Sequence, residues 1–355
     1  MKDKEKYLQG NSIEPIKLTP NMSVKDLVKN YDKMGFNAKR LAEACKTFGK
    51  MIDSDATVCL TLSGAMTPVG VGGLISTMIE KGFIDWIIST GANLYHDMHL
   101  ALDLTMKQGS FNVDDGELYK NGIMRIYDVF ITDETLLTTD KFIVDSLKNR
   151  KIEKPISTAE LHNLLGNELM KRSKFPEKSF LANAAKLNVP IYTSSPGDSS
   201  IGMNLIINRL NKNPIPISPD LDVLETSAIV RSSDKNGVIE IGGGSPKNFF
   251  MQTQPTLWQI LNDDNGGHDF FIQITTDSPQ WGGLSGATPS EAKSWGKVKD
   301  AVKNNVVVYS DATIAFPILC SYILSEKEPR KLKGLYNKRN EFLLDLEARF
   351  KKTHK

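Results

Sequence analysis

The stretch Ala56-Thr-Val-Cys-Leu-Thr-Leu-Ser-Gly64 gives the first clear indication of the fold. A run of apolar and β-branched residues is followed at once by a serine and a glycine, which is typical of a buried strand that ends in a tight turn. Four further runs of this kind follow, and each ends at small or acidic residues: 84–90, 238–241, 270–276 and 305–309.

Segments with helical spacing of apolar residues lie between most of these runs. Near the N-terminus, apolar residues recur every three or four positions from Val24 to Met34, and a second helix is predicted over 38–52. Short apolar strands that alternate with helices indicate a mostly parallel sheet covered on both faces. We therefore predict an α/β, doubly wound fold, with residues 1–20 as a flexible lead-in and 21–355 as one domain.

The composition disfavours several classes of protein. The chain has 44 Lys and Arg against 42 Asp and Glu, so it lacks the basic excess that nucleic-acid binding requires. Its three cysteines are scattered, which disfavours a disulfide framework or a metal cluster. We see neither a secretory leader nor an apolar run long enough for a bilayer, so we predict a cytoplasmic protein without membrane contact.

The ends of the predicted strands favour a nucleotide-like ligand. In open parallel sheets, ligands bind at the carboxyl ends of the strands. Those ends here are small, polar and rich in glycine, which allows close approach of a dinucleotide and its phosphates. An acidic side chain such as Asp311 could accept hydrogen bonds from a ribose diol. Each turn alone is better explained by tight packing, but five of them together favour the ligand.

The segment Ser285-Gly-Ala-Thr-Pro-Ser-Glu-Ala-Lys-Ser-Trp-Gly-Lys297 is the second candidate. Thr288 and Pro289 are typical of a helix start, and Gly296 predicts its end, which places Lys297 beside Trp295. A lysine that is partly desolvated against an aromatic ring has a lowered pKa, and its neutral amine can attack a carbonyl or imine carbon. A lone lysine is far more often an ordinary surface residue, so this pattern does not decide the chemistry.

Other mechanisms find less support. His96 and His99 lack a third metal ligand, so no metal site is predicted. No G-x-S-x-G sequence follows any predicted strand, which disfavours a serine hydrolase.

The 285–297 segment resembles the signature of deoxyhypusine synthase, whose imine-forming lysine ends an S-W-G-K sequence. The resemblance covers about residues 22–330 and rests on four further segments in the family's order: Gly35-Phe-Asn-Ala-Lys-Arg-Leu41, Ser89-Thr-Gly-Ala92, Ile241-Gly-Gly-Gly244 and Asp311-Ala-Thr-Ile-Ala-Phe-Pro317. It implies a single Rossmann-like, NAD-binding catalytic domain that forms a homotetramer with shared active sites. It also implies an aminoalkyl transferase in which Lys297 carries the butylamine group of spermidine as an imine.

The resemblance assigns the remaining roles by position. It implies NAD contacts from Gly64, Ala65, Thr67, Thr90, Gly91, Ala92, Asp198, Gly243, Gly244, Thr276, Asp277, Asp311 and Ala312. The positions that bind substrate would be Asn248, Trp281, Leu284, Glu291, Trp295, Met203, Tyr95 and His96.

The chain departs from the family at several of these substrate positions. Asn248 stands where the family has a histidine, and five other positions that carry carboxylates in the family hold Trp281, Leu284, Met203 and the pair Tyr95-His96. Each lost contact to a cationic amine would cost about 1.5–3 kcal/mol. Aromatic rings at Trp281, Tyr95 and Trp295 could face a cation instead, and a flat guanidinium stacks well on such rings. Core packing of Trp281 is an equally good interpretation.

Three hypotheses follow. The first is NAD-dependent transfer of an aminobutyl or guanidinobutyl group between small amines, in homospermidine- or agmatine-type polyamine chemistry. The second keeps spermidine as donor and a translation-factor lysine as acceptor. The third is a silent NAD-binding scaffold. The intact S-W-G-K segment argues against the third, whereas the lost carboxylates argue mildly for it and disfavour the spermidine pose of the second. His96 is a candidate general base.

Overall fold

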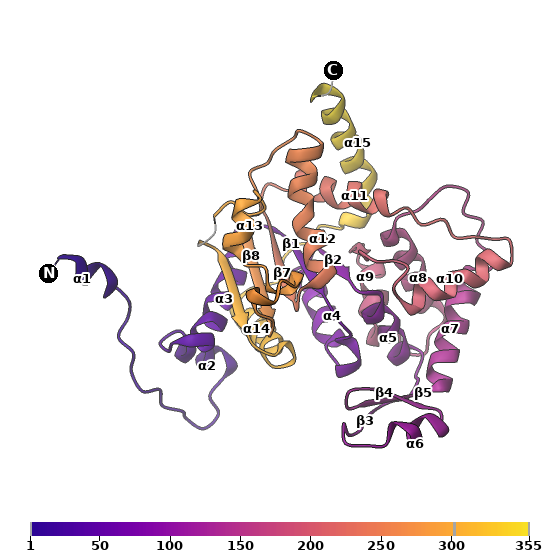
Figure 1. The fold of residues 1–355 in the computed structure, drawn as a ribbon, viewed down its shortest axis with the longest axis horizontal. Coiled ribbons are helices and arrows are strands. Elements are labelled where there is room, and N and C mark those ends of the chain that lie inside the picture. The colour runs from indigo at the N-terminus through magenta and orange to yellow at the C-terminus, as the bar shows by residue number, and fades with distance from the viewer. Residues whose placement is uncertain (1, 301–302, 354–355) are drawn as a thin grey trace.

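The computed structural model describes residues 2–300 and 303–353, and a six-stranded parallel sheet lies at its centre (Figure 1). The strands are β1 (Thr57–Leu62), β2 (Trp86–Ser89), β6 (Ile191–Tyr192), β7 (Asn236–Ile241), β8 (Phe270–Thr275) and β9 (Asn305–Tyr309). Their spatial order is β6-β2-β1-β7-β8-β9, which is the strand order of a Rossmann fold. The predicted α/β, doubly wound fold with a mostly parallel sheet is therefore confirmed.

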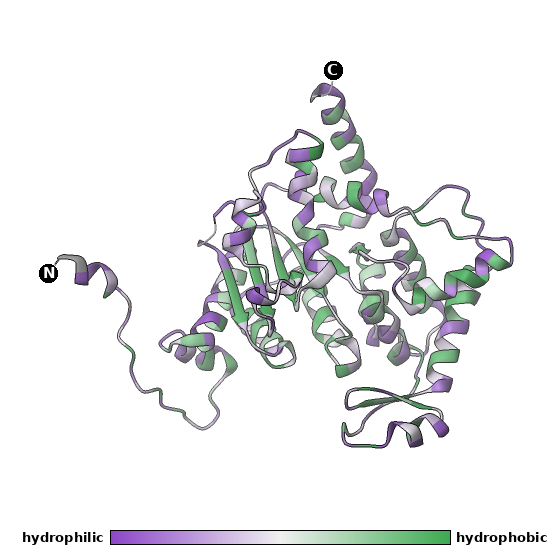
Figure 2. Ribbon diagram, viewed as in Figure 1, coloured by the Kyte–Doolittle hydropathy of each residue, from purple (hydrophilic) through white to green (hydrophobic). Residues whose placement is uncertain are grey.

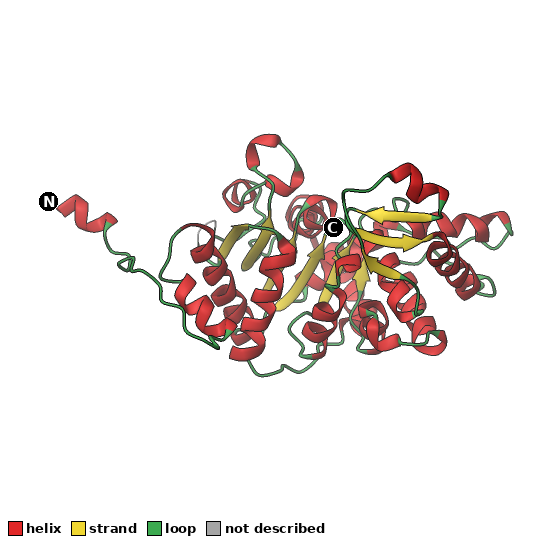
Figure 3. Cartoon of the chain, turned by 90° about the horizontal axis from the view of Figure 1, so that it is seen from below, coloured by secondary structure: helices red, strands yellow, loops and turns green. Residues whose placement is uncertain are grey.

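Helices cover both faces of this sheet (Figure 3). Helices α3 (Phe36–Asp53) and α14 (Ala312–Glu326) pack on one face, and α12 (Gly244–Pro255) packs on the other. Alternate strand residues enter the two cores, since Ile239 and Ile272 face the α3 side while Val238 and Phe271 face the α12 side. Apolar residues accordingly concentrate in the strands (Figure 2).

The remaining helices surround this frame or extend from it. They are α1 (Lys2–Tyr7), α2 (Val24–Tyr31), α4 (Gly72–Glu80), α5 (Gly91–Ala101), α6 (Asp115–Lys120), α7 (Asp133–Leu147), α8 (Thr158–Arg172), α9 (Phe180–Lys186), α10 (Ser200–Leu210), α11 (Pro219–Arg231), α13 (Pro289–Ser294) and α15 (Leu335–Thr353). Among the residues described, no helix combines the length and apolarity needed to cross a bilayer.

Three elements depart from the sequence prediction. A small antiparallel sheet, order β3-β5-β4, is formed by β3 (Met106–Gln108), β4 (Ile123–Ile126) and β5 (Val129–Thr132). It projects with α6 beyond α7 (Figure 1). Strand β6 has two residues, too few to produce a recognisable pattern. The lead-in contains the short helix α1, and residues 8–20 run without helix or strand away from the body of the protein (Figure 1).

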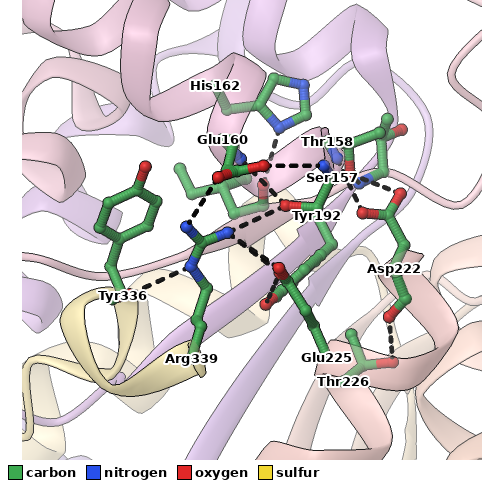
Figure 4. A network of polar contacts seen from close by, with 12 residues as sticks. Ser157, Thr158, Glu160, His162, Tyr192, Asp222, Glu225, Thr226, Tyr336 and Arg339 are labelled. Atoms are coloured by element: carbon green, nitrogen blue, oxygen red, sulfur yellow. Dashed lines mark hydrogen bonds and ion pairs between the residues drawn. The ribbon is translucent and has the colours of Figure 1, made fainter. Parts of the chain in front are cut away.

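A buried polar network ties α15 to the sheet (Figure 4). Arg339 of α15 donates to both carboxylate oxygens of Glu225 on α11, each at 3.1 Å, and to the Ser157 hydroxyl at 2.9 Å. The Tyr192 hydroxyl of β6 donates to the same Glu225 carboxylate at 2.8 Å. Because the charges are paired and hydrogen-bonded, this cluster can be buried without an isolated ion.

Candidate active site

Lys297 lies at a cavity of about 210 Å³ above the α12 face of the sheet. The cavity is walled by α12, by β8 and by the segment that leads through α13 to Lys297. Its lining residues are Lys247, Asn248, Met251, Phe271, Leu284, Ala287, Thr288, Glu291, Ala292, Trp295 and Lys297. Five residues that the sequence analysis assigned to catalysis or substrate binding thus meet at one place: Asn248, Leu284, Glu291, Trp295 and Lys297.

Helix α13 fixes the position of Lys297. The Thr288 hydroxyl accepts from the Glu291 N–H at 3.2 Å and so caps the helix start. At the other end, Gly296 adopts φ +68°, and the Lys297 N–H returns to the Ala292 carbonyl at 3.0 Å, as in a Schellman motif. The Lys297 backbone is therefore held by the helix end, while its side chain is free to point into the cavity.

The surroundings of Lys297 favour a neutral amine. Its Nζ lies 5.6 Å from the centre of the Trp295 ring, and its side chain is half-buried. Burial lowers the pKa of Lys297, and the nearby Lys247 lowers it further, while the Glu291 and Glu240 carboxylates oppose both effects. The net direction is downward, which increases the fraction of Lys297 that can act as a nucleophile.

A second cavity, of about 330 Å³, lies at the carboxyl ends of β1, β7, β8 and β9. It includes the junction of β1 and β7, where the strand order reverses and where Rossmann folds bind dinucleotides. The predicted cofactor residues that line it are Gly64, Gly243, Thr276, Asp277, Asp311 and Ala312.

Ser285 connects the two cavities. It lines the strand-end cavity, and its neighbours Leu284 and Ala287 line the Lys297 cavity. The Ser285 hydroxyl accepts from the Gly244 N–H at 2.9 Å, which ties this loop to the start of α12. A ligand at the strand ends would therefore lie one loop away from the Lys297 side chain.

The other predicted cofactor residues lie near this edge without lining the cavity. The Thr90 hydroxyl donates to the Gly64 carbonyl at 2.6 Å and joins the ends of β1 and β2. The buried Thr67 hydroxyl donates to the Asn93 carbonyl at 2.8 Å, so it serves the packing of α5. The other positions are Ala65 directly after Gly64, Gly91 and Ala92 at the start of α5, the exposed Asp198 after β6, and Gly244 at the start of α12.

Four predicted substrate residues lie outside the Lys297 cavity of the same chain. Tyr95 is buried, and its hydroxyl donates to Asp140 at 2.9 Å. His96 Nδ1 lies 3.0 Å from His99 Nε2, and burial lowers the pKa of His96 to about 4. Trp281 is exposed on the loop after β8, and Met203 is exposed on α10. Of the three aromatic rings considered for a cation, Trp295 alone lines this cavity among the residues described.

The sequence analysis did not identify Lys247 and Glu240 as functional residues. Lys247 is 4% exposed, yet it lines the same cavity as Lys297, and its Nζ lies 3.8 Å from the fully buried Glu240 carboxylate. The signal was present in the sequence, since Val238-Ile-Glu-Ile241 places an acid within an otherwise apolar strand. A buried carboxylate requires a cationic or hydrogen-bonding partner.

Comparison with known proteins gives the class of the protein, a transferase of aminobutyl groups. The sequence model of deoxyhypusine synthase matches residues 26–323. The chain therefore belongs to the deoxyhypusine synthase family, as the S-W-G-K segment indicated.

Relatives of known sequence extend the likeness over nearly the whole chain. A deoxyhypusine synthase-like protein of Nostoc punctiforme is 44% identical over 94% of this chain and 88% of its own length. A protein of Methanosarcina acetivorans named probable deoxyhypusine synthase 2 is 43% identical over 86% of this chain and 88% of its own. The fold is similar to that of a crystal structure described as a candidate deoxyhypusine synthase of Entamoeba histolytica, with a TM-score of 0.60 at 18% identity, over 91% of this chain and 99% of that one.

Proposed function

We propose that this chain uses NAD and Lys297 to transfer an aminobutyl or guanidinobutyl group from one small amine to another. The observation that carries the proposal is the position of Lys297. Its half-buried amine lines a cavity that shares the 284–287 loop with the strand-end cavity. An amine with a lowered pKa next to a dinucleotide site is the arrangement that imine chemistry requires.

The strand-end cavity fits NAD by its chemistry. Gly243 and Gly64 give it a lining without bulky side chains, and Asp277 and Asp311 supply carboxylates that can accept hydrogen bonds from ribose hydroxyls. The amino end of α14 adjoins it at Ala312 and is capped by the Asp311 carboxylate, which accepts from the Thr313 N–H at 2.6 Å. NAD, when bound, would accept hydride from the donor carbon and return it at the end of the cycle.

Lys297 carries the alkyl group between these two redox events. Oxidation of the donor amine, R–CH₂–NH–R′, leaves an imine, R–CH=N–R′, at the donor carbon. The group R′ is alkyl in spermidine and hydrogen in putrescine or agmatine, so the amine expelled in the next step is ammonia for the last two donors. The neutral Lys297 amine adds to that carbon and expels the amine R′–NH₂, which leaves R–CH=N–Lys297. The acceptor amine then adds to the same carbon and expels Lys297, and the new imine is reduced to a secondary amine. Lys297 is thus regenerated.

The charges around the cavity favour a group with one cationic end. Glu291 is the one carboxylate among the described residues that line it, while Lys247 adds a positive charge. A single carboxylate can pair with the terminal ammonium of an aminobutyl group or with a guanidinium, which could also stack on Trp295. A fully charged triamine would find fewer partners. We therefore rank transfer from spermidine to a translation-factor lysine second among the candidate reactions.

Product analysis tests the proposal. The purified protein is incubated with NAD and each of spermidine, putrescine and agmatine, alone and in pairs, and the amine products are identified by mass spectrometry. Homospermidine or a guanidinobutyl-amine product supports transfer between small amines. Turnover only when a translation-factor protein is added supports the second candidate. Absence of any new amine with all partners, despite NAD binding, contradicts both.

We also propose that the active form is a homotetramer with sites completed by a neighbouring subunit. Trp281, Leu284 and Trp295 are half or more exposed near the Lys297 cavity, and a second subunit would cover them. Such an interface could also bring Tyr95, His96 or Met203 of another copy toward the site. Sedimentation of the purified protein measures the assembly directly.

A further inference from the structure

A polar row crosses the centre of the sheet beneath the Lys297 cavity. Thr61 of β1 is in register with Glu240 of β7, which is in register with Gln273 of β8. All three are at most 1% exposed, and they occupy neighbouring positions in strands that are otherwise apolar. Within 2–300 and 303–353, neither Glu240 oxygen nor the Thr61 hydroxyl has a hydrogen-bond partner. Because native proteins rarely leave buried polar atoms unpaired, a carboxylate here requires an explanation.

Lys247 covers this row from α12. Its Nζ donates to Ala287 O at 2.7 Å and to Gln273 Oε1 at 2.9 Å, and it lies 3.5 Å from Ser285 O and 3.8 Å from Glu240 Oε2. A neutral amine has two N–H groups, whereas an ammonium has three, so three neutral acceptors and a carboxylate suit the ammonium. Burial lowers the pKa of Lys247 and raises that of Glu240 to about 8, and the attraction between the two groups opposes both shifts. An ionised Glu240 therefore favours the charged form of Lys247.

Lys247 and Lys297 line the same cavity from opposite segments. A fixed cation near a lysine disfavours protonation of that lysine, a device that activates amines for imine formation. The other ionisable groups around the pair come from several elements. Glu291 of α13 raises the pKa of both lysines, Asp277 after β8 raises that of Lys247, and Cys59 of β1 and His268 before β8 have pKa values that hold both groups neutral.

We propose that Glu240 is a positioning residue for the transfer reaction: it holds Lys247 as a buried cation, whose charge keeps Lys297 in its unprotonated, nucleophilic form. The proposal deepens the proposed function and rests on it. Glu240 does not face the substrate and acts through Lys247. A carboxylate in the middle of a buried strand is thereby explained, because without it the Lys247 ammonium would be buried with neutral acceptors alone.

The pH dependence of Lys297 reactivity tests this without NAD or any amine substrate. Trace labelling with acetic anhydride, read by peptide mass spectrometry, gives the midpoint at which Lys297 becomes reactive, with the exposed Lys186 as internal reference for the reagent. We expect Lys247→Met to raise the midpoint of Lys297 by about 1–2 pH units, since the neighbouring cation is lost. Lys247→Arg keeps the charge and should leave the midpoint unchanged.

Glu240→Gln tests the contribution of the Glu240 carboxylate independently of that of Lys247. With Lys247 present, we expect this change to raise the Lys297 midpoint, because the unpaired Lys247 loses its proton. In the Lys247→Met background it should no longer raise the midpoint, because only the direct attraction between Glu240 and Lys297 is then lost. The double variant removes both buried charges together, a change that folded proteins usually tolerate. It therefore keeps the test informative if either single variant fails to fold.

Two results would overturn the proposal. One is an unchanged or lower Lys297 midpoint in Lys247→Met. The other is a lower midpoint in Glu240→Gln alone, which would mean that Lys247 stays charged without its carboxylate. Failure of the proposed function is distinct, because it consists of an absence of amine products in the wild-type protein and leaves the labelling result unaffected.

Discussion

Replacement of Gly243 by alanine should disable the site without removing any functional side chain. A Cβ at this position would lie 2.4 Å from the Cα and 2.6 Å from the Cβ of Ser285. The φ of Gly243 is 178°, outside the left-handed region, so the prediction rests on the steric contact with Ser285. Carbon atoms in contact normally stand about 3.5–4.0 Å apart, so the Ser285 loop must move by roughly 1 Å.

That displacement acts on both cavities at once. Ser285 accepts hydrogen bonds from Gly244 and, through its carbonyl, from the Gln273 side chain at 2.7 Å. We expect a loss of about 1–3 kcal/mol in the free energy of unfolding from overpacking. We expect the transfer rate to fall by roughly 100-fold, since a misplacement of this size is enough to disrupt a reacting geometry.

The assays are urea denaturation and the formation of amine products under saturating NAD. Gly73→Ala in α4 is the matched control, because its Cβ would meet nothing within 4 Å. It should leave activity unchanged and be neutral or slightly stabilising in a helix. Wild-type stability together with wild-type turnover in Gly243→Ala would refute the close approach of β7 and the Ser285 loop.

Three further predictions concern the frame around the site. Arg339→Met should lower the free energy of unfolding by about 3–5 kcal/mol, as measured by urea denaturation, because it leaves Glu225 buried without its cation. The double variant with Glu225→Gln should recover much of this loss. Equal losses in the single and double variants would contradict the pairing. Gly296→Ala should lower the free energy of unfolding by about 1–2 kcal/mol, because φ +68° disfavours a side chain. It should also reduce the reactivity of Lys297, because the end of the helix shifts. Unchanged stability and reactivity would contradict the Schellman geometry. Burial lowers the pKa of His162 to about 4, below its unfolded value, so its contribution to stability is present above pH 6.5 and is lost as the pH falls toward 4. This loss amounts to about 3 kcal/mol, and a pH series of melts of His162→Asn should be flatter over that window.

Long apolar runs with glycine-rich ends made the central sheet predictable. The five predicted strands each correspond to a strand within two residues, for example 238–241 against Asn236–Ile241. Fully buried parallel strands have a continuous apolar pattern that polar loops interrupt clearly. The S-W-G-K segment was equally informative because its cap, proline and glycine predict one short helix.

The elements that escaped prediction lack such a pattern. The two residues of β6 pair with β2 only because the surrounding fold presents an edge. The strands β3, β4 and β5 have three or four residues each, and most of those in β3 and β4 are only partly buried. Helix α8 was not predicted, but its capping box at Ser157 and Glu160 was a usable signal.

The candidate site, like the fold, was predictable from the sequence only in part. Lys297, Trp295 and Glu291 are neighbours in sequence, so their meeting follows from one helix and its cap. The partnership of Glu240 and Lys247 depends on α12 crossing the strand that precedes it, and spacing alone does not reveal which side chains face each other there. Tyr95 was considered for a substrate cation, but α5 turns it into the core toward Asp140.

Covalent capture at Lys297 tests the central claim most directly. The protein is incubated with NAD and the donor amine, treated with borohydride, digested and analysed by mass spectrometry, with Lys297→Ala and Lys299→Ala in parallel. The account predicts an aminobutyl or guanidinobutyl adduct on Lys297 that persists in Lys299→Ala, and a Lys297→Ala protein that binds NAD but yields no adduct or product. Product formation by Lys297→Ala, or an adduct confined to another lysine, would contradict it.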